Sequence, residues 1–395
     1  MKQVLTIVCK LQPTPKQIDL IEVTLVGFAD ACNYTNQIVK PNITSSVSIQ
    51  NLVYSALREQ FGLSANLAVR ACARVGANRK TAKVKDKPVK NFQPTSADYD
   101  ARIFAFREKD WTVSLTLIGG REHIKLNAGN YQRGKLVGRK PTSAQLCKHR
   151  DGEYYIHIQI KDEAPAPTKS DKVIGVDFGR RDIAVTSIGN KWDGKQITEL
   201  RDKHSRVRAS LQKKATKGTR STRRRARQVL KRLQGRERRF QTWLNHIISK
   251  LIILSALSSK AIVAIEDLTG IRETTNQQPR TKTERRRSNS WSFFQLRQFL
   301  EYKGIQSGVE VVAVSPRYTS QTCHQCLHIH PDQDKSYRSG KSFKCGHCKW
   351  HGDADENGSK MIELVGAAFV NRLGGSGLTC SLDKLDSGLL KAPGL

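Results

Sequence analysis

The sequence predicts an α/β protein of two or three domains, because the hydrophobic pattern changes along its 395 residues. Residues 1–168 combine amphipathic helical segments with segments in which apolar and polar residues alternate. Residues 164–168, Ala-Pro-Ala-Pro-Thr, form a stiff linker that marks a domain boundary. Beyond the linker, short apolar segments end in carboxylates, and two Cys-x-x-Cys pairs follow. These three observations predict a sheet-and-helix domain followed by an α/β domain that carries a metal-binding module.

The start of the chain is predicted to be a half-buried strand followed by a helix. Thr14 can cap this helix, Pro15 suits its first position, and Gln17 stands where a capping box requires it. Tyr34 and Asn36, towards the end of the same helix, are candidates for contacts with nucleic acid. Such groups more often serve only the helix end, so both interpretations stay open.

A second helical region is predicted over about residues 51–80. Apolar residues then alternate on both sides of a hairpin turn at residues 119–120, and again over residues 154–160. This half of the chain is therefore expected to form a small β-barrel or sheet. The helices, at about residues 14–100, are inserted after its first strand.

A buried central strand is predicted at residues 173–177, because this apolar run is too short for a helix and lies between glycine-containing turns. Asp177 places a carboxylate in that strand, where an unpaired charge would be very costly. A divalent metal ion is the usual partner of such a group. Pairing with a nearby arginine, or capping of a turn, explains Asp177 equally well on these residues alone.

Two further strands are expected at residues 183–188 and 196–200, and the most basic part of the chain follows them. The cations that we predict to contact nucleic acid are Lys213, Lys214, Arg220, Arg223, Arg224, Arg227, Lys231 and Arg232. A charge run is usually a solvated helix face, but so many like charges three and four residues apart destabilise a bare helix. Contacts with phosphates would remove that repulsion and release counterions. The run at 280–287 is interpreted as a loop or a further nucleic-acid contact.

A second short strand that ends in carboxylates is predicted at residues 261–268, with Glu266 near its end. One such strand occurs by chance in many α/β proteins. Two in one domain, on either side of a basic helix, are less easily explained by chance. Helical spacing predicts packed helices over residues 240–254 and 291–300, and another strand over residues 309–314.

Four cysteines form the most specific motif, Cys323-x2-Cys326-x18-Cys345-x2-Cys348. Each Cys-x-x-Cys places two thiolates on one tight turn, and two such turns complete a tetrahedral Zn²⁺ site. Disulfides or redox pairs are the alternative, and they fit poorly with a chain that shows no export signal. Four thiolates leave no open coordination position, so this zinc is expected to be structural.

An acidic segment follows the cysteines, and Asp355 is expected in the first turn of a helix whose apolar face packs inward. Simple N-capping is the alternative for Asp353 and Asp355. Asp177, Glu266 and Asp355 together are the set that a two-metal phosphodiesterase requires. The ions expected are two Mg²⁺, or Mn²⁺, of which one activates water and one stabilises the leaving oxygen.

The charge of the chain favours nucleic acid as the partner. Lys and Arg number 68 against 35 acidic residues, which gives a formal net charge of +33. Such self-repulsion is relieved by a polyanion. No apolar run approaches the length of a membrane span, and the N-terminus shows no signal-peptide pattern. Nine cysteines, an odd number, argue against a secreted disulfide framework.

Several segments resemble one known family over most of the chain. They are residues 11–17, 175–179 (Gly-Val-Asp-Phe-Gly), 265–268 (Ile-Glu-Asp-Leu), 291–293, 302–303, 318–323 and Asp355-x-Asn357. The sequence resembles the TnpB family of transposon-encoded, RNA-guided nucleases, which are related to type V CRISPR effectors. It departs from the family at residues 357–359, where Asn-Gly-Ser replaces Asn-Ala-Ala, and at Leu327 and Lys349, where a glycine often follows each cysteine pair.

The resemblance implies an RNase H-like (RuvC) nuclease core, interrupted by a zinc ribbon, behind an N-terminal β-barrel wedge domain with a helical recognition insert. The limits expected are 1–168 for the wedge and insert, 169–319 for the first part of the core, 320–350 for the ribbon, 351–373 for the final core helix and 374–395 for a mobile tail. It also implies a guide RNA made from the transposon end, a double-stranded DNA target read beside a short motif, and a place near the nucleoid in the bacterial or archaeal cytoplasm.

The function expected is RNA-guided, Mg²⁺-dependent cleavage of DNA, with Asp177, Glu266 and Asp355 as the metal ligands. A cleavage-deficient RNA-guided protein that only binds DNA, as a repressor or transposition regulator, would share the charge and the ribbon but would not need the acids. A DNA-strand-transfer transposase is a third interpretation.

Overall fold

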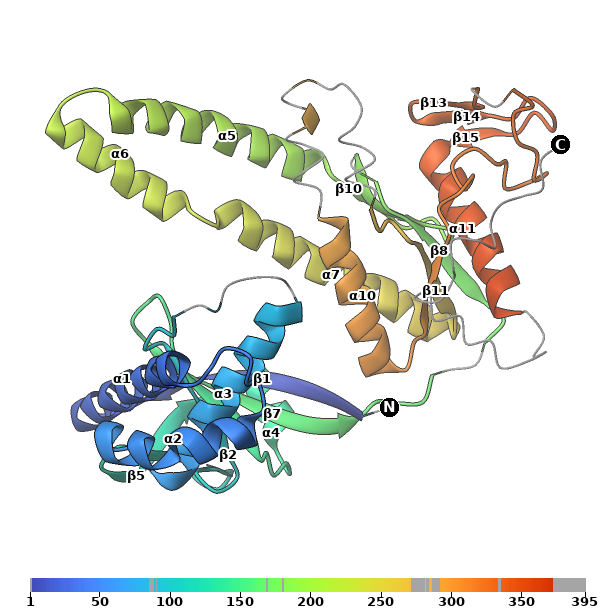
Figure 1. Ribbon diagram of the computed structural model, residues 1–395. Helices are drawn as coiled ribbons and strands as arrows, with labels where there is room; N and C mark the ends of the chain where they lie inside the picture. Colours follow the sequence, from blue (N-terminus) through green and yellow to red (C-terminus); the bar gives the residue numbers. More distant parts are fainter. Residues whose placement is uncertain are drawn as a thin grey trace. The chain divides into compact units, whose positions relative to one another are not determined.

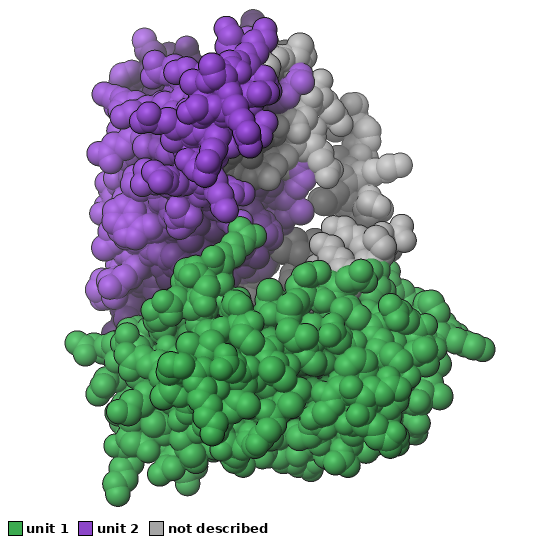
Figure 2. Space-filling view, turned by 90° about the vertical axis from the view of Figure 1, so that its left-hand side faces the viewer, with its two compact units in different colours: residues 1–163 green, residues 164–395 purple. Residues whose placement is uncertain are grey.

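The computed structural model describes residues 2–84, 89, 91–167, 170–179, 181–270, 281, 284–285, 292–332 and 335–371. The chain divides into two compact units, unit 1 (residues 1–163) and unit 2 (residues 164–395), which Figure 2 shows in different colours. The predicted C-terminal tail at 374–395 and most of the basic run at 280–287 lie outside the described residues. No helix among those described is long and apolar enough to span a membrane.

Three helices follow the first strand of unit 1, where the sequence predicts one helix and a second helical region. They are α1 (Pro15–Ile38), α2 (Ser46–Phe61) and α3 (Ala65–Val84), after β1 (Lys2–Gln12). The capping box at α1 is confirmed, since the Thr14 hydroxyl accepts from the Gln17 amide and the Gln17 side chain accepts from the Thr14 amide. The single helical region expected at 51–80 is two helices, because Gly62 adopts a left-handed φ of 63° and ends α2.

Unit 1 also contains a seven-stranded antiparallel sheet with the order β2-β6-β7-β1-β5-β4-β3. Its remaining elements are β2 (Ser96–Asp100), β3 (Phe104–Arg107), β4 (Thr112–Leu117), β5 (Gly120–Asn127), α4 (Asn130–Leu136), β6 (Ser143–Lys148) and β7 (Tyr154–Glu163). Within the described residues no hydrogen-bonded ladder joins the end strands β2 and β3. The sequence predicted a small barrel or a sheet. The structure forms a sheet whose backbone pairing does not close into a barrel. One hydrophobic core joins this sheet to the three helices.

Unit 2 is built on a five-stranded sheet with the order β10-β9-β8-β11-β12. The strands are β8 (Val173–Asp177), β9 (Asp182–Thr186), β10 (Lys191–Asp193), β11 (Ile262–Glu266) and β12 (Val311–Val314). Strands β8, β11 and β12 are parallel, whereas β9 and β10 form antiparallel pairs at one edge.

The strand predicted at 196–200 is wrong, because these residues begin helix α5 (Lys195–Thr216), and the third strand is β10. The two apolar residues of this segment, Ile197 and Leu200, are three residues apart, which is the spacing of a helical face. The residues that continue from this segment to Thr216 are mostly good helix formers, and the backbone therefore stays helical.

Helices cover both faces of the unit 2 sheet. The α7 (Arg236–Ser259) and α10 (Phe293–Ser307) helices pack with Ile174 and Val176 of β8 on one face. The α11 helix (Ala354–Val370) packs with Val173 on the other. Because side chains alternate along a strand, Asp177 falls on the α11 face. The same alternation in β11 places Glu266 on that face, since Ile262 packs with α11 and Val263 with α7 and α10.

Two smaller substructures complete unit 2. Helices α5 and α6 (Arg220–Leu233) pack side by side as a long hairpin (Figure 1). The cysteine motif lies beside a three-stranded sheet of β13 (Arg338–Ser339), β14 (Ser342–Lys344) and β15 (His351–Asp353). Strand β15 leads directly into α11, so this ribbon is joined without a linker to the helix that carries Asp355.

Candidate metal sites and basic surface

Two of the predicted acids lie at the ends of neighbouring parallel strands. Asp177 ends β8, Glu266 ends β11, and the register pairs Val176 with Ile265. Since adjacent strands lie about 4.8 Å apart, the two carboxylates start from neighbouring positions. Both also project towards α11, so the sheet itself brings together two residues that are far apart in the sequence.

The third acid reaches this edge of the sheet from α11. Asp355 lies in the first turn of the helix, and Asp353 caps it by accepting a hydrogen bond from the Asp355 amide over 2.8 Å. The close approach of α11 to the sheet places Gly358 against Asp177, because a β-carbon on Gly358 would be 3.1 Å from Asp177 Oδ2. The glycine that departs from the family pattern therefore lies beside the first candidate ligand.

Burial and neighbouring charges shift the pKa of two acids of this cluster, Asp177 and Glu266. Burial raises the pKa of Asp177 well above its usual value, and the carboxylates of Glu266 and Asp355 raise it further. Burial also raises the pKa of Glu266, although a hydrogen bond from the Thr319 hydroxyl opposes the shift. A cation placed among these groups would favour their ionised forms.

Two cations that the sequence analysis missed already contact Asp355. Arg338 of β13 donates from Nη2 to Asp355 Oδ1 over 2.9 Å, and Lys341 donates from Nζ to Asp355 Oδ2 over 2.8 Å. Lys341 also forms an ion pair with Asp182 of β9. In the sequence Arg338, Lys341 and Asp182 are ordinary charged positions. The signal that could have identified the two cations is their place in the ribbon, the segment that leads into α11.

The donor set fits a hard divalent cation. Three buried or half-buried carboxylates offer the oxygen ligands that Mg²⁺ and Mn²⁺ prefer. Their oxygens do not all lie within 4.8 Å of one another; among the described residues, only the four cysteines form a metal-ligand group that compact. The hydrogen bonds from Arg338 and Lys341 hold both oxygens of Asp355.

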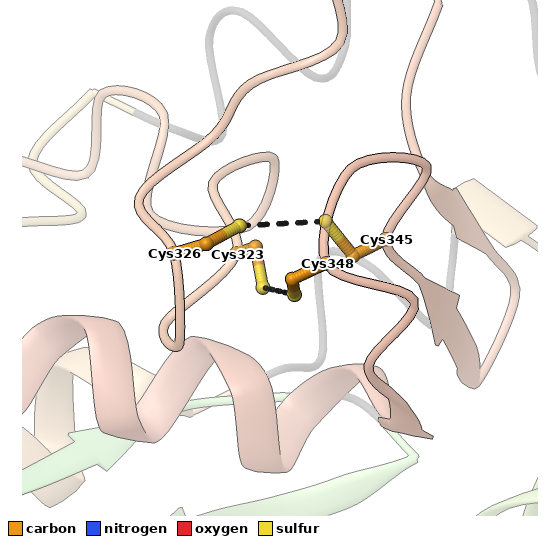
Figure 3. A group of neighbouring side chains, drawn as sticks. All are labelled: Cys323, Cys326, Cys345 and Cys348. Atoms are coloured by element: carbon orange, nitrogen blue, oxygen red, sulfur yellow. Dashed lines mark hydrogen bonds between the residues drawn. The ribbon is translucent and has the colours of Figure 1, made fainter.

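The four cysteines form a compact cluster (Figure 3). Cys323 Sγ lies 3.7 Å from Cys348 Sγ, and Cys326 Sγ lies 3.6 Å from Cys345 Sγ. A tetrahedron with Zn–S bonds of about 2.3 Å has edges of about 3.8 Å, so the sulfur atoms already stand at the spacing of a zinc site. All four are free thiols. Burial opposes the shift, but backbone hydrogen bonds at Cys348 and His347 lower the pKa of Cys345 to about 7.

The residue that follows each cysteine pair adopts the backbone that glycine favours, although neither residue is a glycine. Leu327 and Lys349, each directly after a cysteine pair, have φ values of 58° and 65°. Non-glycine residues in this region are strained by roughly 1–2 kcal/mol. Leu327 and Lys349 therefore keep the backbone geometry of the turns, and the strain of this geometry lowers the stability of the fold.

One buried amide connects the first of these turns to α11. The Asn357 side chain is fully buried, donates to the Thr322 carbonyl over 2.8 Å, and accepts from the His324 amide over 3.0 Å. Asn357 lies two residues after Asp355, so the position of Asp355 depends on the cysteine cluster as well as on the sheet.

The predicted nucleic-acid residues fall into two groups. Those of the basic segment lie on the α5–α6 hairpin and are exposed: Lys213, Lys214, Arg220, Arg223, Arg224, Arg227, Lys231 and Arg232. Within the part of the chain that the structure describes, no acidic side chain forms an ion pair with any of them. Ala226 of α6 and Ala215 of α5 are buried, and Arg227 donates from Nη2 to the Ala215 carbonyl over 3.5 Å, so this side of α6 faces α5.

The other two predicted residues make contacts inside unit 1. The Tyr34 ring lies 5.5 Å from the Phe61 ring and packs against the core. Asn36 accepts a hydrogen bond from the buried Arg79, which also donates to the Val39 carbonyl at the end of α1. These contacts agree with the helix-end interpretation that the sequence left open. Both side chains remain half-buried, so nucleic-acid contact at these positions is still a prediction.

Comparison with known proteins gives the same relatives by sequence and by family model. A model described as "Cas12f1-like, TNB domain" matches residues 293–362. The chain is 28% identical over 244 residues to the CRISPR-associated endodeoxyribonuclease Cas12f1 of Sulfoacidibacillus thermotolerans, covering 58% of this chain and 54% of the relative. It is 28% identical over 198 residues to the TnpB-like protein MJ0751 of Methanocaldococcus jannaschii, covering 48% and 67%. It is also 26% identical over 254 residues to the putative RNA-guided DNA endonuclease InsQ of Escherichia coli K12, covering 59% and 58%. The matched region thus spans about half the length of the Cas12f1 relative.

Solved structures share the fold. The structure of a Cas12f1–sgRNA–target DNA complex aligns with a TM-score of 0.58 at 14% identity, covering 88% of this chain and 80% of that chain. The structure of the mini-RNA-guided endonuclease CRISPR-Cas_phi3 aligns with a TM-score of 0.58 at 11% identity, covering 95% and 94%. The resemblance read from the sequence is therefore confirmed: the chain is related to the TnpB-like proteins and to Cas12f1.

Proposed function

We propose that this protein is an RNA-guided, Mg²⁺-dependent DNA endonuclease with an RNase H-like (RuvC) core. The observation that carries the proposal is that the ends of β8 and β11 and the first turn of α11 bring Asp177, Glu266 and Asp355 to the same end of the unit 2 sheet. The names of the relatives, which are endodeoxyribonucleases and a putative RNA-guided DNA endonuclease, support the same activity.

The three carboxylates would hold two Mg²⁺ or Mn²⁺ ions. When bound, such ions activate water for attack on the phosphodiester and stabilise the leaving oxygen. Asp177 and Glu266 are fixed by the sheet, while α11 and the ribbon position Asp355. The guanidinium of Arg338 is half-buried beside Asp355 and can donate two parallel hydrogen bonds to a phosphate of the cut strand.

The remaining parts supply binding rather than chemistry. The exposed cations of the α5–α6 hairpin suit phosphate backbones, which carry no sequence information. Sequence readout would then come from base pairing with a guide RNA, made from the transposon end as the family resemblance implies. The structural zinc would hold the ribbon that positions Asp355. The resemblance places this activity at the nucleoid of a bacterial or archaeal cell.

The test begins with the protein purified together with its RNA, which is sequenced to identify the guide. Wild type and Asp177→Ala are then compared on double-stranded DNA that matches the guide, with and without Mg²⁺. We expect cleavage by the wild type only, and only with Mg²⁺. Equal nicking by both proteins would show that the carboxylate cluster is not the active site.

Two other functions give different products in the same assay. A protein that binds guide-matched DNA without cutting it would retard the DNA equally with and without Asp177. A strand-transfer transposase would give joined products instead of free 3′-hydroxyl ends. The complete set of three acids favours the nuclease over a protein that only binds DNA.

A further inference from the structure

Both carboxylate oxygens of Asp355 accept hydrogen bonds from cations. Oδ1 accepts from Arg338 over 2.9 Å, and Oδ2 accepts from Lys341 over 2.8 Å. A carboxylate must offer a lone pair to bind a metal ion. Each oxygen of Asp355 keeps a further lone pair, but the two cations lie beside the carboxylate and compete with a metal ion for its negative charge.

Lys341 already contacts a second carboxylate. Its ammonium group forms an ion pair with Asp182, which begins β9 and is only 5% exposed. The backbone of Lys341 is held in place as well, because its carbonyl accepts from the amide of Ala354 over 2.8 Å. The ammonium group can therefore shift between Asp182 and Asp355 without any movement of the ribbon.

Asp182 belongs to a chain of alternating charges that surrounds the start of α11. Lys191 of β10 lies 2.9 Å from Asp182 and 2.9 Å from Asp353, which caps the helix. Asp182, Asp353 and Asp355 thus share two lysines, and Arg338 completes the series. In the part of the chain that the structure describes, this network of charged groups directly contacts Asp355, a candidate metal ligand.

We propose that Asp182 is a positioning residue that holds the ammonium group of Lys341 when Asp355 turns to a divalent metal ion. The inference rests on the proposed function of the three-carboxylate site. Removing one partner of a buried ion pair is strongly unfavourable, because the other charge is left uncompensated. With Asp182 present, Lys341 can leave Asp355 while staying paired, so metal binding does not leave the half-buried ammonium group without a partner.

The test measures metal binding rather than cleavage. Mn²⁺ is titrated by calorimetry into full-length, zinc-loaded protein freed of nucleic acid, and Asp177→Asn defines the signal that does not come from the site. In Asp182→Asn, Lys341 has only Asp355 as a carboxylate partner and competes more strongly with Mn²⁺. We expect affinity to fall about tenfold, the effect of about one charge-assisted hydrogen bond. In the double variant Asp182→Asn/Lys341→Gln the competitor is absent, and we expect affinity to return to within about twofold of the wild type.

A matched control separates this competition from a general loss of negative charge. Asp267→Asn makes the same change one residue from Glu266, where the Asp267 carboxylate is paired with Arg297 over 2.6 Å and does not contact Lys341. We expect this variant to bind Mn²⁺ like the wild type. Thermal unfolding without added divalent ions checks that each variant is folded.

The outcomes distinguish this inference from the proposed function. If the wild type shows no Mn²⁺ binding that depends on Asp177, the proposed metal site fails. If the wild type binds but Asp182→Asn is unchanged, or is weakened only as much as Asp267→Asn, the role of Asp182 is wrong. Failure of Lys341→Gln to restore binding in the double variant would also overturn it.

Discussion

Gly175, in the middle of β8, lies directly against the backbone of Ser359 in α11. A β-carbon at this position would overlap the Ser359 carbonyl oxygen and the amide of Glu363. The contact sets how closely the helix that carries Asp355 approaches the strand that carries Asp177. The strand therefore needs glycine there for reasons of space, and the backbone of Gly175 needs no unusual dihedral angle.

Gly175→Ala is expected to push α11 away from the sheet and to destabilise the protein. Overpacking a core by one methyl group costs about 1–3 kcal/mol. Urea unfolding measures the loss, and Mn²⁺ affinity should fall with it because Asp355 moves from Asp177. Gly134→Ala is the control, since nothing lies within 4 Å of a β-carbon in this helical position and alanine favours a helix. Equal effects of the two substitutions would contradict the close packing of α11.

Asp177→Asn is expected to stabilise the metal-free protein at neutral pH. The raised pKa of Asp177 means that the folded state binds its proton more tightly than the unfolded state. The contribution of this group is complete below the unfolded pKa, which is about 3.9, and is lost as the pH rises through the folded value. At pH 7 the melting temperature of the variant should therefore exceed that of the wild type, by about 2–4 °C for each kcal/mol of unfolding free energy gained. The difference should shrink towards pH 4.

Asp162→Asn serves as the comparison of opposite sign. A hydrogen bond from Arg139 lowers the pKa of the half-buried Asp162. Its contribution is present above the unfolded pKa and is lost as the pH falls, so this variant should be slightly less stable than the wild type at pH 7. A melting temperature for Asp177→Asn that is lower than the wild type without metal would contradict the buried acid cluster.

Leu327→Gly is expected to stabilise the ribbon. Leu327 is 61% exposed and has a φ of 58°, so glycine relieves strain and removes little packing. The gain should be about 0.5–1 kcal/mol after the larger entropy of glycine in the unfolded chain. Thermal unfolding with zinc bound measures the gain. Leu327→Ala keeps the strained backbone and should not show it; an equal gain from alanine would point to the lost side chain instead.

Zinc removal is expected to loosen the start of α11 as well as the ribbon. Asn357 connects the Thr322 carbonyl to this helix, so loss of the first cysteine turn removes its partners. Elemental analysis should find one zinc per chain, and a chelator should increase hydrogen exchange over residues 322–357. Cys147→Ser, in unit 1, should retain the metal. Absence of zinc, or unchanged exchange after chelation, would rule out a structural zinc ribbon.

Neutralising the outer face of α6 is expected to weaken nucleic-acid binding and to reduce its salt dependence. Arg220 and Arg224 are exposed and lie four residues apart on the helix. Each phosphate contact contributes about 0.7–0.9 to the slope of log affinity against log salt. Changing both to glutamine should lower the slope by about 1.4–1.8 if both contact phosphate. Lys16 and Lys109, exposed in unit 1, provide the same charge change. An equal drop in slope from that pair would mean that total charge, and not the hairpin, decides binding.

The sequence predicted those features of the fold that follow from local pattern. The capping box at Thr14, the hairpin turn at 119–120 and the alternation in β7 each depend on neighbouring residues, and the structure forms them. The prediction from local pattern failed at two places. Residues 196–200, predicted as a strand, belong to α5, and Ile197 and Leu200 already have the three-residue spacing of a helix. The region at 51–80 needed the left-handed Gly62 to divide it.

The sequence alone also determined which residue types could bind metal, because apolar strands that end in acids and paired cysteines at fixed spacing are local signals. Tertiary structure decided what surrounds them. Arg338, Lys341 and Asp182 meet at Asp355 only because the ribbon folds back onto β9 and α11, and no periodicity of the chain encodes that contact. Side-chain pairing between distant elements depends on the packed geometry of the whole unit, so it is fixed only once the chain has folded.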